Sequence, residues 1–334
     1  MDKMLQIVNL TKYFDSKSSF ISLKSSPVVK AVDNVSFDIY KNETLGLVGE
    51  SGCGKSTLGR AILRLQEPTS GSVIFEDTNL NSLKPEELRK FRTKMQIVFQ
   101  DSYSSLNPRH KIGYIIAEPM TIHTTMTRRE IRERIYELLN LVGLKKSHAS
   151  RFPHEFSGGQ RQRINIARTL ALYPSFIICD EPISALDVSI QAQVINLLQD
   201  LQNKLGITYL FIAHDLSMVH HISDRIAVMY LGKIMELTGS DQLFSDPLHP
   251  YTQSLISAIP IPDPKRERNR KPIILEGEVP SPVNSPAGCV FHTRCPVADE
   301  ICSLKKPEYH EIKKDHFVAC HYAGKRKVVE IAHL

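Results

Sequence analysis

Two segments near the N-terminus alternate apolar and polar residues with a period of two. They cover residues 4–14 (MLQIVNLTKYF) and residues 28–40 (VVKAVDNVSFDIY). This alternation is typical of half-buried antiparallel strands, and the Ser- and Lys-rich residues 15–27 between them predict a loop. Further short strands are predicted at residues 71–75 and 95–99. The N-terminal part of the chain is therefore expected to contain an antiparallel sheet.

Longer apolar runs predict strands that are buried on both faces. One run covers residues 44–48 and ends before a glycine, a second (FIIC) covers residues 176–179, and a third (TYLFIA) covers residues 208–213. Residues 225–230 and 233–237 have the same character and are expected to complete the sheet.

Apolar residues recur with helical period in three other segments. The first, residues 58–65, directly follows a buried strand, and its apolar positions fall on one helical face. The second, residues 131–142, lies within a region at about residues 101–165 that is helical in pattern and predicts an insertion. The third covers residues 190–201. Helices that separate buried strands predict an α/β fold.

Composition narrows the class of protein. The 334 residues are 42% hydrophobic and 23% charged, which is enough for one large domain with a full core and an appendage. No apolar stretch approaches the ~18 residues that span a bilayer, and the first ten residues lack the apolar core of a secretory signal. We expect a soluble protein that is not exported. The net charge of +6 permits an anionic partner without requiring one.

The sequence GESGCGKS follows the first buried strand and fits the phosphate-binding pattern G-x-x-x-x-G-K-[ST]. Gly52 and Gly54 let the backbone turn its N–H groups toward the phosphates of a nucleotide, and the helix that begins near Lys55 adds the positive end of its dipole. Lys55 is expected to reach the β- and γ-phosphates, and the Ser56 hydroxyl to ligate Mg²⁺. A chance match in a glycine-rich turn is the alternative, which the flanking strand and helix disfavour.

Polar residues stand at the ends of two further buried strands. Asp180 and Glu181 follow FIIC, and His214 follows TYLFIA. Beside a phosphate loop, a carboxylate at the C-terminal end of a parallel strand is well placed to hold Mg²⁺ through water, and the next carboxylate can accept a proton from attacking water. Without the phosphate loop, carboxylates that merely end a strand would be the favoured interpretation.

The segment FSGGQRQR (residues 156–163) resembles the signature motif of ATP-binding cassette (ABC) ATPases. The chain carries in order GESGCGKST, Gln100, FSGGQ, FIICDE, SALD (residues 184–187) and His214, as members of this family do. The resemblance implies an ATPase that uses ATP and Mg²⁺. It also implies an α/β P-loop nucleotide-binding domain over residues 1–245, with a mixed sheet core, an antiparallel β subdomain and a helical insertion.

The resemblance gives each motif a role. Phe14, with Tyr13 beside it as a rival, is expected to stack on adenine. Gln100 is expected to contact Mg²⁺ and the attacking water, Asp180 to hold the metal, and Glu181 to act as general base. The residues expected to bind the phosphates are Gly49, Ser51, Gly52, Cys53, Gly54, Lys55, Ser56 and Thr57.

Two of the implied roles involve a second cassette. His214 resembles the histidine that contacts the γ-phosphate within its own subunit, whereas Ser157, Gly158, Gly159 and Gln160 would complete the ATP site of the other subunit. Catalysis then requires two cassettes that face each other head to tail. Because this chain holds one set of motifs, it must pair with itself or with a sister subunit, and a paralogue is usual in this family.

The C-terminal part narrows the resemblance. From about residue 246 the chain becomes rich in proline, and HPYTQSL (residues 249–255) resembles the extension of the ATPases that drive bacterial oligopeptide and dipeptide importers, including nickel-type relatives. SFISLKSS (residues 19–26) and SLNPR (residues 105–109) support the same group. The extension is expected to cover residues 246–334.

This narrower resemblance implies the ATP-hydrolysing subunit of a peptide importer at the cytoplasmic face of the inner membrane. Its expected partners are two transmembrane permeases, a second ATPase subunit and, indirectly, an extracytoplasmic solute-binding protein, with no nucleic acid. Import of nickel or another small solute is an alternative within the family. A soluble ABC ATPase that acts on nucleic acid or ribosomes is an alternative outside it, although such proteins usually carry two cassettes in one chain. An exporter ATPase fits the core but not the extension.

Four of the six cysteines lie in the extension. Cys289, Cys295, Cys302 and Cys320 have the spacing C-x5-C-x6-C-x17-C, and four thiolates can ligate a [4Fe-4S] cluster or a tetrahedral zinc ion. Zinc ribbons usually contain close C-x2-C pairs, which are missing here, and peptide-importer ATPases with this cysteine pattern are thought to carry [4Fe-4S]. We therefore expect a [4Fe-4S] cluster with a structural task, with zinc or unligated thiols as alternatives.

Overall fold

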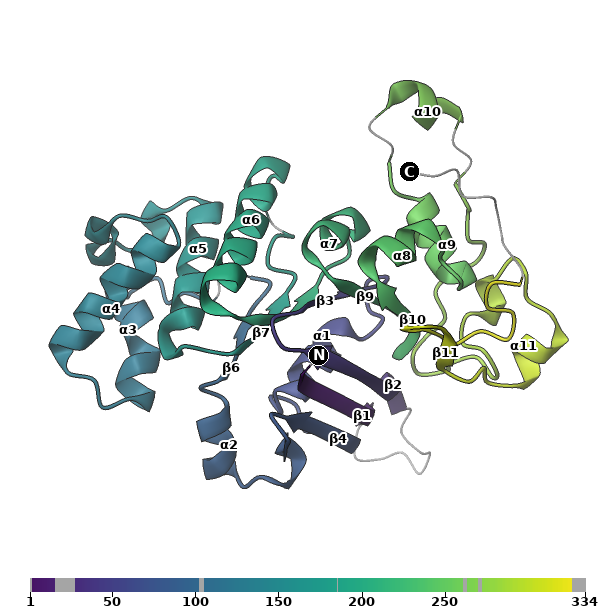
Figure 1. Cartoon of the computed structure of the whole chain (residues 1–334), viewed down its shortest axis with the longest axis horizontal. Coiled ribbons are helices and arrows are strands. Elements are labelled where there is room, and N and C mark those ends of the chain that lie inside the picture. Colours follow the sequence, from purple (N-terminus) through teal and green to yellow (C-terminus); the bar gives the residue numbers. More distant parts are fainter. Residues whose placement is uncertain are drawn as a thin grey trace, which may run out of the picture. The chain divides into compact units, whose positions relative to one another are not determined.

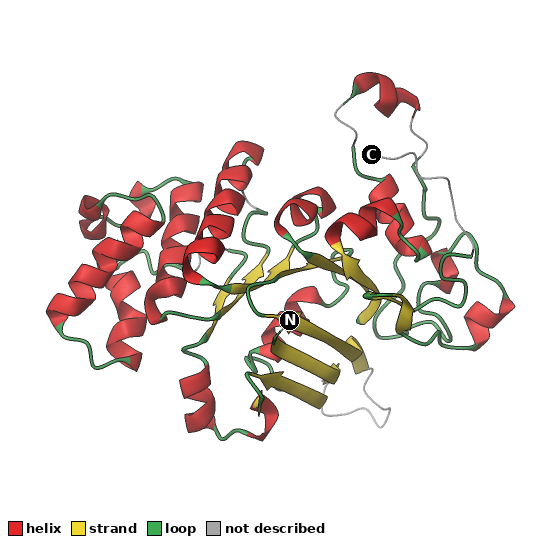
Figure 2. Ribbon diagram, in the orientation of Figure 1, coloured by secondary structure: helices red, strands yellow, loops and turns green. Residues whose placement is uncertain are grey.

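The computed structural model describes residues 2–15, 28–101, 105–184, 186–260, 263–269 and 272–325. Residues 19–26 and Ala185, both used above, lie outside the described residues. The chain divides into two compact units. Figures 1 and 2 show its helices and strands. The first unit comprises Met1–Met4, Ile39–Thr44 and Asn79–Ala213, and the second comprises Leu5–Asp38, Leu45–Thr78 and His214–Leu334.

The first unit contains three parallel strands in the order β8-β7-β6. These are β6 (Met95–Val98), β7 (Phe176–Asp180) and β8 (Thr208–Ile212). Every residue of β7 and β8 is buried, as the continuous apolar runs predicted. Because the strands are parallel, their C-terminal ends meet at one edge, where Asp180 ends β7.

The helices of the first unit lie partly within residues 101–165. They are α2 (Pro85–Phe91), α3 (Ile112–His123), α4 (Arg128–Leu141), α5 (Gly158–Thr169) and α6 (Val188–Leu205). In α4 a capping box joins Thr127 and Glu130, and the apolar repeat buries Ile135, Leu138 and Leu139. Among the described residues, no helix is both long and apolar enough to cross a membrane.

The second unit contains an antiparallel sheet in the order β2-β1-β4-β5. Its strands are β1 (Lys3–Asp15), β2 (Val28–Tyr40), β4 (Ser70–Phe75) and β5 (Thr78–Asn79). Leu5 pairs with Phe75, and both side chains are fully buried. The alternating pattern therefore predicted the strands and their buried face correctly.

The second unit also contains a mixed sheet in the order β11-β12-β10-β9-β3. The strands β3 (Thr44–Val48) and β9 (Arg225–Tyr230) are parallel, whereas β10 (Lys233–Gly239) is antiparallel to β9. The last two strands, β11 (His310–Lys313) and β12 (His316–Val318), extend this sheet from the C-terminal part of the chain. The sequence pattern did not indicate these two strands.

The helices of the second unit are shorter. They are α1 (Lys55–Ile62), α7 (Leu216–Ile222), α8 (Ser240–Ser245), α9 (Pro250–Ser257), α10 (Pro264–Asn269) and α11 (Glu300–Leu304). The expectation that Leu65 continues the apolar face of α1 is wrong. The helix ends at Ile62, Arg64 adopts a left-handed conformation with φ of 49°, and Leu65 is 47% exposed.

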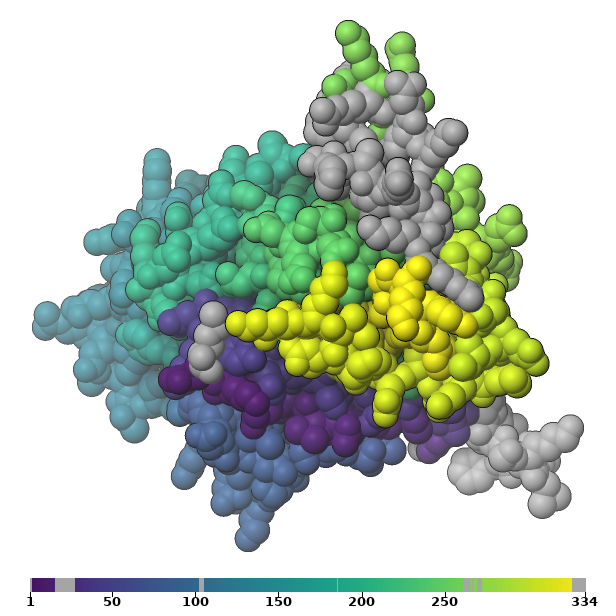
Figure 3. Space-filling model, turned by 45° about the vertical axis from the view of Figure 1, so that its right-hand side comes forward, coloured from purple at the N-terminus to yellow at the C-terminus, as the bar shows by residue number. Residues whose placement is uncertain are grey.

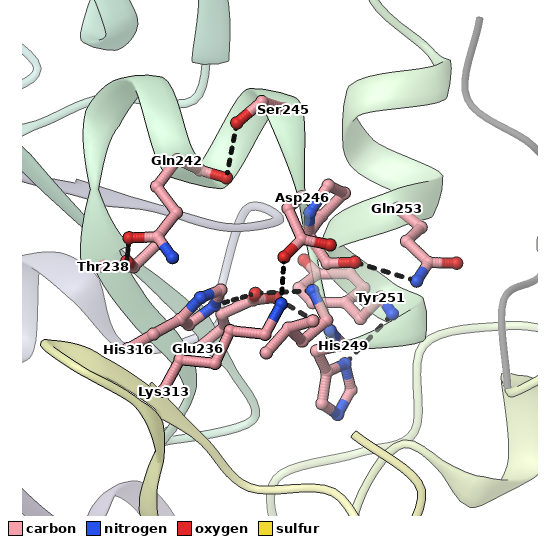
Figure 4. A network of polar contacts seen from close by, with 12 residues as sticks. Glu236, Thr238, Gln242, Ser245, Asp246, His249, Tyr251, Gln253, Lys313 and His316 are labelled. Carbon is pink, nitrogen blue, oxygen red and sulfur yellow. Dashed lines mark hydrogen bonds and ion pairs between the residues drawn. The ribbon is translucent and has the colours of Figure 1, made fainter. Parts of the chain in front are cut away.

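The C-terminal residues are fastened to the rest of the second unit by a buried carboxylate (Figure 4). Glu236 in β10 is fully buried and accepts hydrogen bonds from the backbone N–H of Leu248 (2.7 Å) and of His249 (3.0 Å). His316 in β12, also fully buried, places its Nε2 2.7 Å from the same carboxylate. Further along, the Pro282 carbonyl accepts a hydrogen bond from the N–H of Lys30 in β2. Figure 3 shows the face on which C-terminal residues, coloured yellow, reach the surface. The C-terminal residues thus share the core of the second unit.

Candidate active site

The phosphate loop lies in the second unit, between β3 and α1. Two of its glycines are required by the backbone. Gly49 has φ of 151° and Gly54 has φ of 107°, and a Cβ atom would lie 2.1 Å from the Met229 carbonyl oxygen at the first position and 2.0 Å from the Ala31 carbonyl oxygen at the second. Gly54 is the N-cap of α1. The loop therefore presents its backbone to a ligand at the start of a helix, as phosphate binding requires.

Lys55 is held inside this loop. Its side chain is 5% exposed, and its Nζ donates to the carbonyl of Gly49 (2.7 Å) and to the carbonyl of Glu50 (3.0 Å). The Sγ atom of Cys53 lies 3.8 Å from the same Nζ. Burial raises the pKa of the Cys53 thiol although the Lys55 charge opposes the shift, so Cys53 contributes packing and backbone rather than a reactive thiolate.

Tyr13 and Phe14, the two candidates for stacking on adenine, lie at the end of β1 and differ in their contacts. The Tyr13 hydroxyl donates to Asp33 (2.8 Å), which also forms an ion pair with Lys233 (2.8 Å). Burial and the Asp33 carboxylate raise the pKa of Tyr13 to about 12. The ring of Phe14 has Lys12 Nζ 4.8 Å from its centre. Because the Tyr13 hydroxyl is hydrogen-bonded to Asp33, the arrangement favours Phe14 as the ring that stacks on adenine.

Two candidate catalytic residues of the first unit meet directly. Gln100 Nε2 donates to Glu181 Oε2 at 2.6 Å, although the residues are 81 positions apart. Glu181 has φ of 48°, and its N–H donates to the Ile212 carbonyl (2.9 Å). A left-handed conformation of a non-glycine residue costs ~1–3 kcal/mol and occurs often at functional sites. Asp180, at 1% exposure, precedes it at the end of β7.

The FSGGQ segment forms the start of α5 in the first unit. Ser157 is the N-cap, and its hydroxyl accepts from the N–H of Gln160 while the Gln160 side chain accepts from the N–H of Ser157 (3.1 Å). A Cβ atom at Gly159 would lie 2.5 Å from Ile190 in α6. Glycine thus permits the close packing of α5 on α6, and the capping box fixes the first turn, where Gly158 also lies.

His214 begins the last segment of the second unit, two residues before α7. Its side chain is exposed. Its neighbour Asp215 serves α7 as N-cap, since the carboxylate accepts from the N–H of Ser217 (2.8 Å) and of Met218 (3.3 Å). Local structure therefore occupies Asp215, while the exposed His214 stays the predicted contact with a ligand.

The four C-terminal cysteines line one cavity in the second unit, together with His249, Phe291 and Tyr322 among others. The N–H of Cys289 donates to the Cys302 carbonyl at 2.8 Å. The backbone N–H of Tyr322 also donates to the sulfur of Cys320 at 3.4 Å. The structure has no disulfide bond among the six cysteines.

The thiols of this cavity have raised pKa values. Burial, with the charges of Cys295 and Cys302 adding to it, raises the pKa of Cys289 to about 11, and burial with the neighbouring thiols raises that of Cys320 to about 12. Within the described part of the chain, no three His, Cys, Asp or Glu side chains are arranged as a ready set of metal ligands. The cavity therefore brings the four cysteines together, but they do not form such a ligand set in this structure.

Comparison with known proteins identifies the family. Residues 32–184 match the ABC transporter family, and residues 235–302 match the C-terminal region of oligopeptide/dipeptide transporters. The chain is 56% identical over 321 residues to the oligopeptide transport ATP-binding protein AppF of Bacillus subtilis (strain 168), which covers 96% of this chain and 97% of that protein. The chain belongs to the ATP-binding subunits of peptide ABC transporters.

Two further similarities agree with this membership. The transporter ATPase is 53% identical over 319 residues to the oligopeptide transport ATP-binding protein OppF of Escherichia coli (strain K12), with 95% of each chain covered. A dimeric structure of the ATP-binding cassette MJ0796 bound to ADP and Pi is 30% identical, with a TM-score of 0.63, and covers 71% of this chain and 99% of that chain. The predicted α/β ABC fold and the ATPase class are confirmed.

The family also decides between the functional alternatives of the sequence. The prediction of an ATPase that serves peptide import is confirmed at the level of the family. A soluble ABC ATPase that acts on nucleic acid or ribosomes is not favoured, because the C-terminal region itself matches peptide transporters. The individual roles of the site residues and the division at residue 246 stay predictions.

Sequence reasoning missed a cavity of about 260 Å³ in the first unit of the transporter ATPase. It is lined by β6, α3 and α5 and by Phe99, the residue directly before Gln100 in the chain. Phe99 and Ile122 at its edge are 42% and 54% exposed. The ion pair of Arg168 with Glu118 (3.2 Å) lies on its wall. The sequence signal for this cavity was the apolar pair of Phe99, directly after β6, and Ile122, near the end of α3.

Proposed function

We propose that this chain hydrolyses ATP within a dimer of cassettes and thereby energises the import of di- or oligopeptides. In this proposal it binds two permease subunits at the cytoplasmic face of the inner membrane, pairs with a second ATPase subunit, and serves an extracytoplasmic solute-binding protein indirectly. The match to AppF along 96% of the chain carries the proposal, because it includes the cassette and the C-terminal extension together. The MJ0796 cassette bound to ADP and Pi is dimeric, which supports the pairing.

The phosphate loop is proposed to bind ATP as follows. Lys55, which now donates to two loop carbonyls, would turn its ammonium toward the β- and γ-phosphate oxygens. The Ser56 hydroxyl, Gln100 and Asp180 are the proposed contacts of Mg²⁺, which would draw charge from the phosphate oxygens. Phe14 would stack on adenine, and the backbone of residues 49–57 would hold the phosphates.

Hydrolysis is proposed to use the pair of Gln100 and Glu181. Gln100 donates to Oε2 of Glu181, and the Glu181 carboxylate would accept a proton from water as that water attacks the γ-phosphorus and the bond to ADP breaks. His214 would stabilise the γ-phosphate charge. Residues 157–160, which begin α5, would complete the site of the opposite subunit with their helix N-terminus.

The cavity of the first unit is the proposed contact with a permease. Exposed Phe99 and Ile122 offer apolar surface to a helix of a membrane partner, and Arg168 and Glu118 offer polar contacts at its wall. Because Phe99 directly precedes Gln100, a partner in this cavity would be next to the residue that holds Glu181. This adjacency is a physical route from ATP hydrolysis to movement of the permeases.

We also propose that Cys289, Cys295, Cys302 and Cys320 hold a [4Fe-4S] cluster, with zinc as the alternative. The four residues line one cavity, and the backbone N–H of Tyr322 already donates to the sulfur of Cys320, an interaction that stabilises a metal-bound thiolate. A bound metal would stabilise the thiolate forms, which burial and the neighbouring thiols disfavour. Anaerobic purification followed by iron, sulfide and zinc analysis tests this site, and absence of all three would refute it.

The catalytic proposal is tested with Glu181→Gln in the transporter. This variant should retain ATP binding, lower hydrolysis by about 100-fold or more because the proton acceptor is lost, and accumulate as an ATP-bound dimer in size-exclusion chromatography. Glu133→Gln, which changes an exposed carboxylate paired with Arg129 on α4, is the matched control and should behave as wild type. Near-normal hydrolysis by Glu181→Gln would contradict the assignment of the base.

A further inference from the structure

An ion pair joins the phosphate loop to the four-cysteine cavity. Arg294 Nη1 lies 3.1 Å from Oε1 and 2.9 Å from Oε2 of Glu50, the second residue of the GESGCGKS sequence. The side chain of Arg294 is 9% exposed and that of Glu50 is 25% exposed. The Tyr230 hydroxyl lies 3.5 Å from the same nitrogen. This pair spans 244 positions of sequence and is largely withdrawn from solvent.

The backbone of Glu50 is held at both polar groups. Its N–H donates to the hydroxyl of Tyr251 at 3.0 Å, and its carbonyl accepts from Lys55 Nζ at 3.0 Å. Tyr251 is fully buried in α9, whose N-cap is His249. Figure 4 shows how His249 and Tyr251 follow the buried Glu236 network. A displacement of Glu50 would therefore move the carbonyl that positions the ammonium of Lys55.

Arg294 depends on the cysteine cavity for its own position. It directly precedes Cys295 in the chain and ends the short helical turn His292–Arg294. The N–H of Arg294 donates to the carbonyl of Phe291 (3.0 Å), and that of His292 to the carbonyl of Cys289 (3.1 Å). Phe291 packs on Tyr251 with ring centres 5.2 Å apart. A metal bound through Cys289 and Cys295 would thus fix the backbone on both sides of Arg294.

The charge of Glu50 gives this pair a consequence for nucleotide binding. A carboxylate next to Gly49 lies in a loop whose ligand carries several negative charges, so an unpaired Glu50 would repel the phosphates through a partly buried, weakly screened environment. We infer that Arg294 is a positioning residue that neutralises Glu50, and that the four-cysteine module thereby sets the affinity of the phosphate loop for ATP. The coupling to metal rests on the metal site proposed above.

The test measures the dissociation constant of a fluorescent ATP analogue with Mg²⁺, using the metal-loaded full-length chain. Arg294→Ala should weaken binding about tenfold, equivalent to ~1.4 kcal/mol, and Arg294→Lys should stay within about threefold of wild type because the charge is kept. Adding Glu50→Gln to Arg294→Ala should restore most of the affinity, since no charge is left to neutralise. Lys313→Met, which removes an ion pair with Asp246 in the same unit, is the control and should match wild type.

Metal removal supplies the second arm of the test. Chelation should weaken binding by wild type to the level of Arg294→Ala and should weaken Arg294→Ala little further, because both changes act through Glu50. Affinity of folded Arg294→Ala within twofold of wild type would overturn the role of Arg294. Equal losses on chelation in wild type and in the Arg294→Ala/Glu50→Gln double variant would overturn the coupling.

Two measurements separate the failures of the two proposals. Iron and zinc content is determined on the same samples, so a preparation without metal refutes the metal site and its coupling, while the Arg294 comparison still decides the role of the ion pair. Thermal unfolding checks that each variant is folded. If Arg294→Ala fails to fold, the single variant Glu50→Gln decides, because it should bind nucleotide at least as tightly as wild type; a tenfold loss would contradict the inference.

Discussion

Replacement of Glu236 by leucine should loosen the C-terminal residues from the sheet to which they are joined. The wild-type carboxylate satisfies the N–H groups of Leu248 and His249 and contacts His316, in a position that is fully buried. Leucine fills similar volume but accepts no hydrogen bond. Leaving a buried donor without an acceptor costs ~1–3 kcal/mol, and breaking a buried pair from one side costs ~3–5 kcal/mol. The lower ends of these two ranges together give about 4 kcal/mol, which is the loss that we expect.

Amide hydrogen exchange of the full-length chain measures this loss locally. A change of about 4 kcal/mol corresponds to exchange roughly a thousand times faster, and it should appear in residues 246–257 and 316–318 while β7 stays protected as an internal reference. Lys313→Met, which breaks the more exposed pair with Asp246, should change exchange by about 1 kcal/mol or less. If Glu236→Leu altered these segments no more than Lys313→Met does, the buried carboxylate would not be what fastens them.

Other perturbations test the ring proposed to stack on adenine, the half-buried Asp33 and the proposed metal ligands. Phe14→Ala should weaken ATP binding about tenfold through lost stacking, whereas Tyr13→Phe, which removes only the hydroxyl bound to Asp33, should stay within about threefold; equal losses in a binding titration would rule out Phe14 as the selective ring. Burial raises the pKa of Asp33, but the hydrogen bond and charge of Lys233 outweigh it and lower the pKa below 3.8. A lowered pKa means that the carboxylate stabilises the fold above its unfolded pKa and loses this effect as pH falls below it. Asp33→Asn should therefore flatten the decline of the urea midpoint in the acid range, and parallel curves for variant and wild type would contradict this. Cys302→Ser should lower the bound iron or zinc to less than half of wild type, and unchanged metal content would remove Cys302 from the ligand set.

Local sequence patterns were sufficient for most of the fold because burial repeats with the period of each element. The alternation over residues 4–14 and 28–40 became β1 and β2, and the apolar runs became β7 and β8. The pattern failed where backbone conformation overrides periodicity. Leu65 continues the apolar spacing of α1, yet the left-handed Arg64 ends that helix first.

Contacts between distant residues were outside the reach of sequence patterns. The motif order indicated that Gln100 and Glu181 serve one site, but only the structure shows their direct hydrogen bond. Glu50 stands at a variable position of the phosphate motif, and nothing in the sequence joins it to Arg294. Likewise β12 is three residues long, too short for a period, and is held by a pairing with β10 that no local pattern encodes.

Peptide uptake by the assembled transporter tests the central claim most directly. The chain is reconstituted in liposomes with its permeases, its partner ATPase and the solute-binding protein, and entry of a labelled peptide is followed after addition of Mg²⁺ and ATP. With Lys55→Met, which removes the ammonium that now donates to Gly49 and Glu50, uptake and ATP hydrolysis should both fall to background. Undiminished peptide uptake by this variant would contradict the account.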